Sequence, residues 1–171
     1  VAPAPMFSDN MVIQRNTEAP VWGNADAEEK VSVTASWGAN ASTTADKDGK
    51  WQVTLKTPKA GGPHTITLKA NNTVEINNVL SGEVWFCSGQ SNMDFYLKQL
   101  RKSNPKRTLP EDAITAEYIN KEVTTAGDDQ LRQFEVQKNT SPFEPLNTLN
   151  GNWLISSPKT NDNFSATAYF F

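Results

Sequence analysis

The sequence predicts a β-sandwich of immunoglobulin-like type followed by the beginning of an α/β domain. Two observations lead to this prediction. Short runs of alternating apolar and polar residues recur at close spacing over residues 1–80, as in half-buried antiparallel strands. From residue 81 onward, short apolar runs alternate with helical stretches, which is typical of a parallel sheet. We therefore expect two domains, at residues 1–80 and 81–171.

The strands of the first domain are predicted from side-chain alternation. Val31, Val33 and Ala35 fall on one face of such a run, and the polar residues between them fall on the other. Asp48-Gly49 and Gly61-Gly62-Pro63 supply turn residues between runs. About seven short strands in this length favour a small sandwich. The expected strands are 11–14, 20–23, 31–37, 42–45, 51–55, 64–68 and 73–76.

The second domain is predicted to begin with a buried strand at 83–88 that leads into a helix over about 92–102. A second helix is expected near 111–123, short strands at 131–136 and 153–155, and a helix within 163–171 capped by Asn161, Asp162 or Asn163. Loops are expected between 102 and 111 and over 137–151. So few strands leave a parallel sheet open. We expect an incomplete domain, the N-terminal part of a longer polypeptide.

Composition narrows the possible partners. The net charge is −3, and the basic stretch from Lys98 to Arg107 has no interleaved aromatic residues, so we expect no nucleic-acid partner. No apolar run approaches the length of a membrane span. The first residues resemble a mature N-terminus, which predicts a secreted or periplasmic protein whose signal peptide has been removed. The single cysteine, Cys87, is expected to pack inside the 83–88 strand.

Ser91 is the candidate reactive residue. A strand that passes through a tight turn into a helix holds a hydroxyl at the carboxyl end of a sheet, beside the unpaired N–H groups of the helix. A serine nucleophile normally needs a histidine base, and this chain has one histidine, His64, in the first domain. We expect His64 to be structural. No cofactor or metal is expected, because no Cys/His cluster has zinc spacing and Asp46 to Gly49 has the pattern of a hairpin turn.

Several segments resemble the sialate O-acetylesterases, a branch of the SGNH (GDSL-like) hydrolases. The Gly-Gln-Ser-Asn-Met block directly after a Val-Trp strand is the most specific of them. The matching segments are 7–15 (FSDNMVIQR), 20–23 (PVWG), 48–51 (DGKW), 61–63 (GGP), 82–93 (GEVWFCSGQSNM) and 163–171 (NFSATAYFF). The resemblance implies an N-terminal β-sandwich and a three-layer SGNH domain with a parallel sheet. It also implies hydrolysis of acetyl esters on sugars, notably 9-O-acetylated sialic acid.

The resemblance also implies roles for individual residues. It makes Ser91 the nucleophile, with its own backbone N–H in the oxyanion hole. From their position beside Ser91, Gln90 and Asn92 are candidate oxyanion or substrate contacts, with a role as turn residues as the alternative. The family's catalytic Asp and His lie in a C-terminal Asp-x-x-His block, which this sequence lacks. As an alternative role, Ser91 fits a capping box with Asp94. We predict instead that Asp94 serves the first helical turn electrostatically.

Three functional hypotheses follow. The first is a carbohydrate O-acetylesterase whose partners are an O-acetylated sugar and the missing C-terminal half, as a second chain or fragment. The second is a non-catalytic fragment that binds carbohydrate or docks against another chain. The third is an esterase of acetylxylan type. A sugar-stacking surface of Trp22, Trp37, Trp51 and Trp85 is weighed against core packing, and their positions within strands favour the core.

Overall fold

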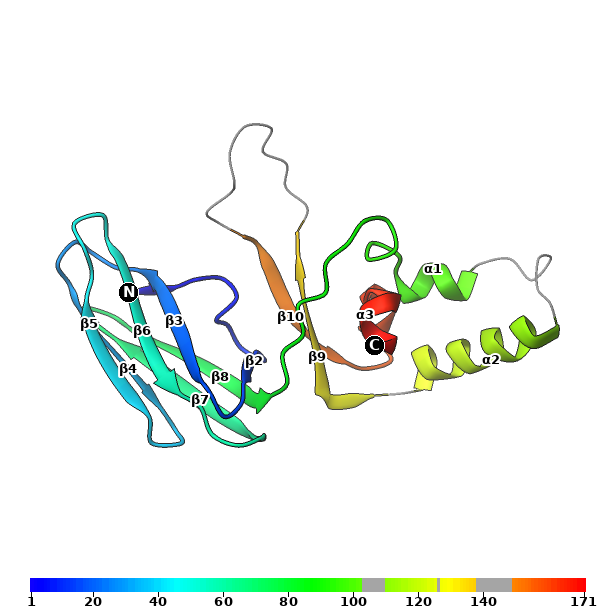
Figure 1. Cartoon of the computed structure of the whole chain (residues 1–171), viewed down its shortest axis with the longest axis horizontal. Coiled ribbons are helices and arrows are strands. Elements are labelled where there is room, and N and C mark those ends of the chain that lie inside the picture. Colours follow the sequence, from blue (N-terminus) through cyan, green and yellow to red (C-terminus); the bar gives the residue numbers. More distant parts are fainter. Residues whose placement is uncertain (103–109, 126, 138–148) are drawn as a thin grey trace. The chain divides into compact units, whose positions relative to one another are not determined.

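The computed structural model describes residues 1–102, 110–125, 127–137 and 149–171, and Figure 1 shows its elements. The chain divides into two compact units. The first unit comprises Val1–Val84 and Phe134–Trp153. The second comprises Trp85–Gln133 and Leu154–Phe171.

Two sheets make up most of the first unit. A three-stranded sheet has the order β1-β3-β6, and a five-stranded sheet has the order β2-β8-β7-β4-β5. Strand β2 pairs with β8 in parallel, whereas β4, β7 and β8 pair antiparallel. The bounds are Ala2–Pro3 (β1), Val12–Gln14 (β2), Glu18–Asn24 (β3), Lys30–Ala35 (β4), Asn40–Thr44 (β5), Lys50–Lys56 (β6), Gly61–Lys69 (β7) and Thr73–Gly82 (β8).

One apolar core is shared by the two sheets. Strands β3 and β6 bury every second residue, which places Val21 and Leu55 inside. Val33 and Leu68, from the five-stranded sheet, are fully buried in the same cluster. Each such side chain contributes about 1.5–3 kcal/mol on burial. All seven predicted strands are confirmed, and the immunoglobulin-like class stays a prediction.

The turn at Asp46 to Gly49 is also confirmed. Gly49 has φ 75° and donates its N–H to the Asp46 carbonyl oxygen, 2.9 Å away. Asp46 Oδ1 accepts the N–H groups of Asp48 and Lys50 at 2.9 and 2.8 Å. This side chain holds the turn through backbone donors.

The predicted buried strand at 83–88 is wrong. β8 ends at Gly82, and the following residues form no strand. Trp85 is 66% exposed and Phe86 is 93% exposed. Cys87 is exposed as well, so the expectation of a packed thiol is also wrong. The apolar run was interpreted as a buried strand, but a strand forms only beside a neighbour that pairs with it. The described residues place no such neighbour there.

The tryptophans divide between core and surface. Trp51 is buried in the sheet core, as predicted. Trp22 and Trp85 are exposed, so the prediction of core packing is wrong for both. Trp22 lies on the outward face of β3, where its ring meets the edge of Phe7 at a centroid distance of 4.7 Å. Trp37 is half-buried and donates its indole N–H to the Lys56 carbonyl oxygen.

Strands β9 and β10 form a separate two-stranded sheet, and each strand has residues in both units. The second unit otherwise consists mainly of helices. Its small core joins the helices through Leu97, Ile119, Val123, Phe164 and Ala166. The second predicted helix and both predicted strands are confirmed, whereas the predicted loops lie largely outside the described residues. The bounds are Leu97–Lys102 (α1), Pro110–Thr125 (α2), Asp128–Val136 (β9), Gly151–Ser156 (β10), the 3-10 helix Asn161–Asn163 (η2) and Ala166–Phe170 (α3).

The cap of the last helix differs from the prediction. Ser165 caps α3 by accepting the Ala168 N–H, whereas none of the three predicted caps does so. Asn161 is fully buried, and its Oδ1 accepts the Ser156 hydroxyl and the Ser157 N–H at 2.8 and 2.9 Å. Because its side chain makes these two bonds, Asn161 belongs to the turn that precedes α3. Among the described helices, none is long and apolar enough to cross a bilayer.

A polar clamp holds the end of β8 against β2. Arg15 donates its Nε–H to Glu83 Oε1 at 2.6 Å, and Gln14 Nε2 donates to Oε2 at 3.0 Å. Gln14 Oε1 in turn accepts the Val84 N–H at 2.9 Å. The hydrogen bonds from Gln14 and then Arg15 lower the pKa of the Glu83 carboxyl.

We predict that Glu83→Gln lowers the midpoint of thermal unfolding at pH 7 slightly. A lowered folded-state pKa contributes stability above the unfolded-state value, and this is lost as pH falls through the folded-state value. The difference from the parent chain should therefore shrink below about pH 4.5. Circular dichroism across pH measures it, with the exposed Glu18→Gln as control. A difference that is constant with pH would contradict the clamp.

Candidate functional site

Ser91 lies in an exposed turn rather than at the start of a helix. The Met93 N–H donates to the Gln90 carbonyl oxygen at 3.0 Å, which closes the turn around Ser91 and Asn92. A Cβ on Gly89 would lie 2.8 Å from Met93 Cγ, so glycine permits this close approach. Gln90, Ser91 and Asn92 are all exposed. In the described part of the chain, no hydrogen bond engages the Ser91 hydroxyl.

The predicted helix start at residue 92 is wrong, because α1 begins at Leu97. The Tyr96 N–H donates to Gln99 Oε1 at 2.7 Å, an interaction that caps this end of the helix. Its first turn contains no acidic residue, so the electrostatic role predicted for Asp94 is wrong. The unpaired N–H groups of a helix are therefore not adjacent to Ser91 in the chain. Ser91 is not a helix cap either.

The segment that follows this turn pairs with the last matching block of the sequence, 163–171. Residues 95–97 and 164–166 form a backbone pairing, which we call the bracket. The Leu97 N–H donates to the Phe164 carbonyl oxygen at 2.9 Å, and the Ala166 N–H donates to the Phe95 carbonyl oxygen at 2.8 Å. Tyr96 and Ser165 form an antiparallel bridge between them. This pairing keeps residues 95–96 extended, which delays the start of α1.

Side chains extend the bracket in two directions. Thr167 Oγ1 donates to the Asn92 carbonyl oxygen at 3.0 Å, directly beside Ser91 in sequence. The Ser165 N–H donates to Gln133 Oε1 at 3.1 Å. Sequence reasoning missed Thr167 and Gln133. The matching block at 163–171 marked the segment of Thr167 but not its contact, and no sequence signal marked Gln133.

Tyr169 is the ionisable group of α3. Its hydroxyl donates to Glu122 Oε1 at 3.2 Å, which ties α3 to α2. Partial burial, as the largest influence, raises the pKa of Tyr169. A phenol with a raised pKa stays neutral at pH 7 and keeps this hydrogen bond.

His64 has a structural environment in the first unit. It lies half-buried on β7, with Nδ1 at 3.5 Å from Ser36 Oγ. Its ring meets Trp37 at a centroid distance of 5.1 Å. These contacts are those of a structural histidine, and the sequence contains no other. The described residues also contain no group of three or more His, Cys, Asp or Glu side chains placed to hold a metal.

Comparison with known proteins identifies the family. The sialate O-acetylesterase of Pongo abelii is 33% identical over 142 residues, which are 76% of this chain and 26% of that protein. The human sialate O-acetylesterase is 36% identical over 109 residues, 57% of this chain and 21% of that protein. No protein-family model matches. The chain belongs to the sialate O-acetylesterase family.

A solved structure extends the match to the fold. A carbohydrate acetylesterase from Xanthomonas citri superposes with a TM-score of 0.81 at 32% identity, over 99% of this chain and 36% of that one. The predicted family resemblance is thus confirmed, and so is a mostly β architecture shared with a carbohydrate acetylesterase. The chain spans about a quarter or less of the curated relatives that it matches.

We predict that Thr167→Val loosens the Ser91 turn. Loss of one hydrogen bond of about 0.5–1.5 kcal/mol should speed chymotryptic cleavage after Phe95 about 2- to 10-fold. Mass spectrometry of the early fragments measures it. Thr124→Val is the matched control, because it removes a threonine-to-carbonyl bond inside α2 instead. Equal acceleration in both variants would show that Thr167 does not hold the turn.

Proposed function

We propose that this chain carries the nucleophile, Ser91, of a carbohydrate O-acetylesterase. The observation that favours this most is the exposed Gly-Gln-Ser-Asn-Met turn, which Thr167 of the last matching block contacts and which the bracket follows. The names of its relatives, sialate O-acetylesterase and carbohydrate acetylesterase, support an esterase that acts on sugars. An exposed hydroxyl in a tight turn suits attack on an ester that approaches from solvent.

The proposed reaction is acyl transfer through an acetyl-serine. Ser91 Oγ forms a bond to the acetyl carbonyl carbon while a base takes the hydroxyl proton. The Ser91 backbone N–H, with Gln90 and Asn92 side-chain amides, donates to the oxyanion. The intermediate then breaks its bond to the sugar oxygen, which receives the proton. Water attacks the acetyl-serine in the same way and releases acetate and free Ser91. No cofactor takes part in these steps.

The base is proposed to come from outside the sequence of this chain. His64 is occupied structurally, so the catalytic Asp and His are assigned to a C-terminal half, present as a second chain or fragment. Together the two parts would form an immunoglobulin-like sandwich followed by a three-layer SGNH domain with a parallel sheet. A secreted or periplasmic location belongs to the same proposal.

The proposed substrate is 9-O-acetylated sialic acid, in line with the names of the curated relatives. A second candidate is an acetylated neutral polysaccharide such as acetylxylan. It is favoured by the structural neighbour, which is named a carbohydrate acetylesterase without reference to sialic acid. A non-catalytic role in binding carbohydrate or another chain is the third possibility. It is motivated by the absence from this sequence of the family's catalytic histidine.

Labelling with a fluorophosphonate tests the nucleophile. In a longer protein that contains this chain and the proposed C-terminal half, we predict a single adduct on Ser91. Ser91→Ala should abolish labelling, whereas the matched control Ser88→Ala should keep it. Peptide mapping after intact-mass measurement locates the adduct. An adduct on another serine, or none in the longer protein, would contradict the proposal.

Acetate release separates the two substrates. We predict that the longer protein releases acetate from 9-O-acetylated sialic acid and that Ser91→Ala reduces the rate at least about 1000-fold. A quantitative acetate assay on sialic acid and on acetylxylan measures both rates. Faster release from acetylxylan would replace the sialic acid assignment, and activity that survives Ser91→Ala would remove Ser91 from the mechanism.

A further inference from the structure

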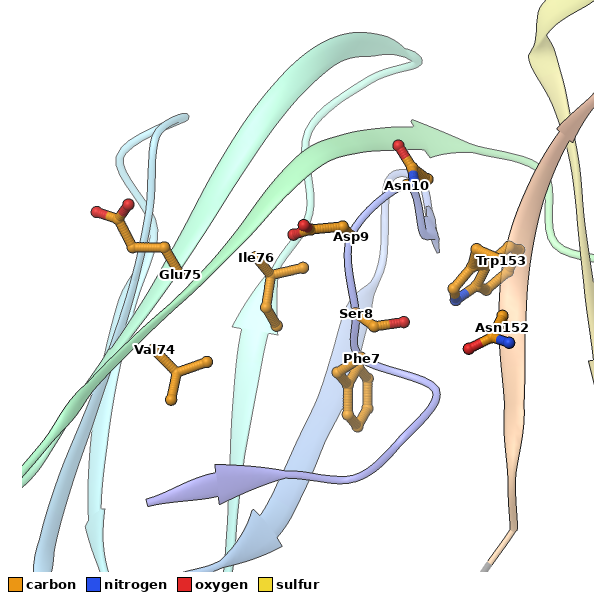
Figure 2. Close-up of a pocket in the computed structure, with 9 residues that line it drawn as sticks. All are labelled: Phe7, Ser8, Asp9, Asn10, Val74, Glu75, Ile76, Asn152 and Trp153. Carbon is orange, nitrogen blue, oxygen red and sulfur yellow. The ribbon is translucent and has the colours of Figure 1, made fainter.

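A second candidate site lies in the first unit, outside the esterase residues. A cavity of about 420 Å³ opens between the segment around Phe7 to Asn10, strand β8 and the start of β10. Figure 2 shows the nine side chains that line it. Its volume falls in the range of small-molecule sites, and its open mouth suits a ligand that stays partly solvated. None of the lining residues belongs to the Ser91 turn.

An apolar surface forms part of the cavity. Phe7 is buried, Trp153 is half-buried, and both line the cavity from different segments. The Trp153 indole N–H donates to the Met6 carbonyl oxygen at 2.8 Å, which fixes the ring in the first unit. Because its only donor is used in this bond, Trp153 offers a ligand apolar ring surface. Sugar rings present C–H groups that pack on such surfaces.

The polar wall is held by hydrogen bonds to β8. The Asn10 N–H donates to the Asn77 carbonyl oxygen at 3.0 Å, and the Asn77 N–H donates to Asp9 Oδ1 at 2.7 Å. Asn78 Nδ2 donates to Asn10 Oδ1 at 2.8 Å. Asn10 and Asn78 both adopt positive φ, 69° and 55°, which asparagine tolerates better than most residues. A wall fixed in this way loses little entropy when it binds a ligand.

The charge of the lining indicates the ligand class. Asp9 contributes a carboxylate, the Glu75 carboxylate points away from Trp153 and Asn152 (Figure 2), and none of the nine lining residues is Lys, Arg or His. Carboxylate oxygens accept hydrogen bonds from sugar hydroxyls, while the Asn152 amide and the Ser8 hydroxyl supply donors and acceptors. An anionic sugar would meet the like charge of Asp9 without a compensating cation among the lining residues. The geometry therefore points to a neutral ligand rich in hydroxyl groups.

We propose that this cavity is a binding subsite for an uncharged oligosaccharide. It would hold the glycan on the first unit by packing against Trp153 and by hydrogen bonds to Asp9 and Asn152. The Asp9 carboxylate disfavours sialic acid, whose own carboxylate is negatively charged. Binding here is independent of Ser91, so it stands or fails separately from the proposed esterase activity.

Nuclear magnetic resonance titration of the whole chain tests the subsite. Xylohexaose and mannohexaose are the neutral probes, and trisialic acid is the anionic probe. At least one neutral probe should shift the Trp153 indole and Asn152 side-chain resonances with a Kd of about 1 mM. Asn152→Ala should raise that Kd about 2- to 10-fold, as expected for one lost hydrogen bond. Asn40→Ala, an exposed strand asparagine outside the cavity, should leave it unchanged.

Charge is tested with a second variant pair. Asp9→Asn should weaken neutral-sugar binding, while Glu18→Gln on β3 should have no effect. Both carboxylates belong to exposed residues, so neither variant threatens the core. The proposal is overturned if neither neutral probe shifts these resonances at about 10 mM. Equal affinity for trisialic acid, or shifts produced by Ca²⁺ but not by sugar, would overturn it as well.

Discussion

The bracket between residues 95–97 and 164–166 is the constraint on which the arrangement of the second unit depends. Its two backbone hydrogen bonds join segments far apart in sequence. The same segments contribute Leu97, Phe164 and Ala166 to the small core. Because Phe95 pairs within the bracket, the residues before it form a turn and not a helix. Ser91 lies exposed in this turn.

Several apolar side chains near the Ser91 turn are exposed. Val84, Trp85 and Phe86 follow the last strand of the first unit, and Phe171 lies at the end of the chain. Trp85 and Phe171 contact each other at a ring-centroid distance of 5.0 Å, yet both stay largely exposed. An apolar surface of this kind is typical of an interface. We propose that the C-terminal half assigned to the esterase covers it.

The strands of the first unit could be predicted from sequence because their alternation reports directly on burial. Val31 and Val33 alternate with polar residues, and such a strand needs to bury only one of its two faces. The prediction of a buried strand at 83–88 is wrong because an apolar run indicates burial only where a neighbouring strand exists. The predicted start of α1 is wrong because residue 95 pairs with residue 166, and no local sequence pattern encodes this contact. Ser91 was found by its motif, whereas Thr167 and Gln133 contact the site through tertiary packing alone.

Amide hydrogen exchange at Leu97 and Ala166 tests the bracket most directly. These two N–H groups donate its backbone bonds, and Leu97 is fully buried. If the bracket is one cooperative unit, the two amides should exchange slowly and with the same opening free energy, although they lie in segments distant in sequence. Exchange of either amide at the rate of an unstructured peptide, or clearly different opening free energies, would contradict a pairing that fixes the Ser91 turn.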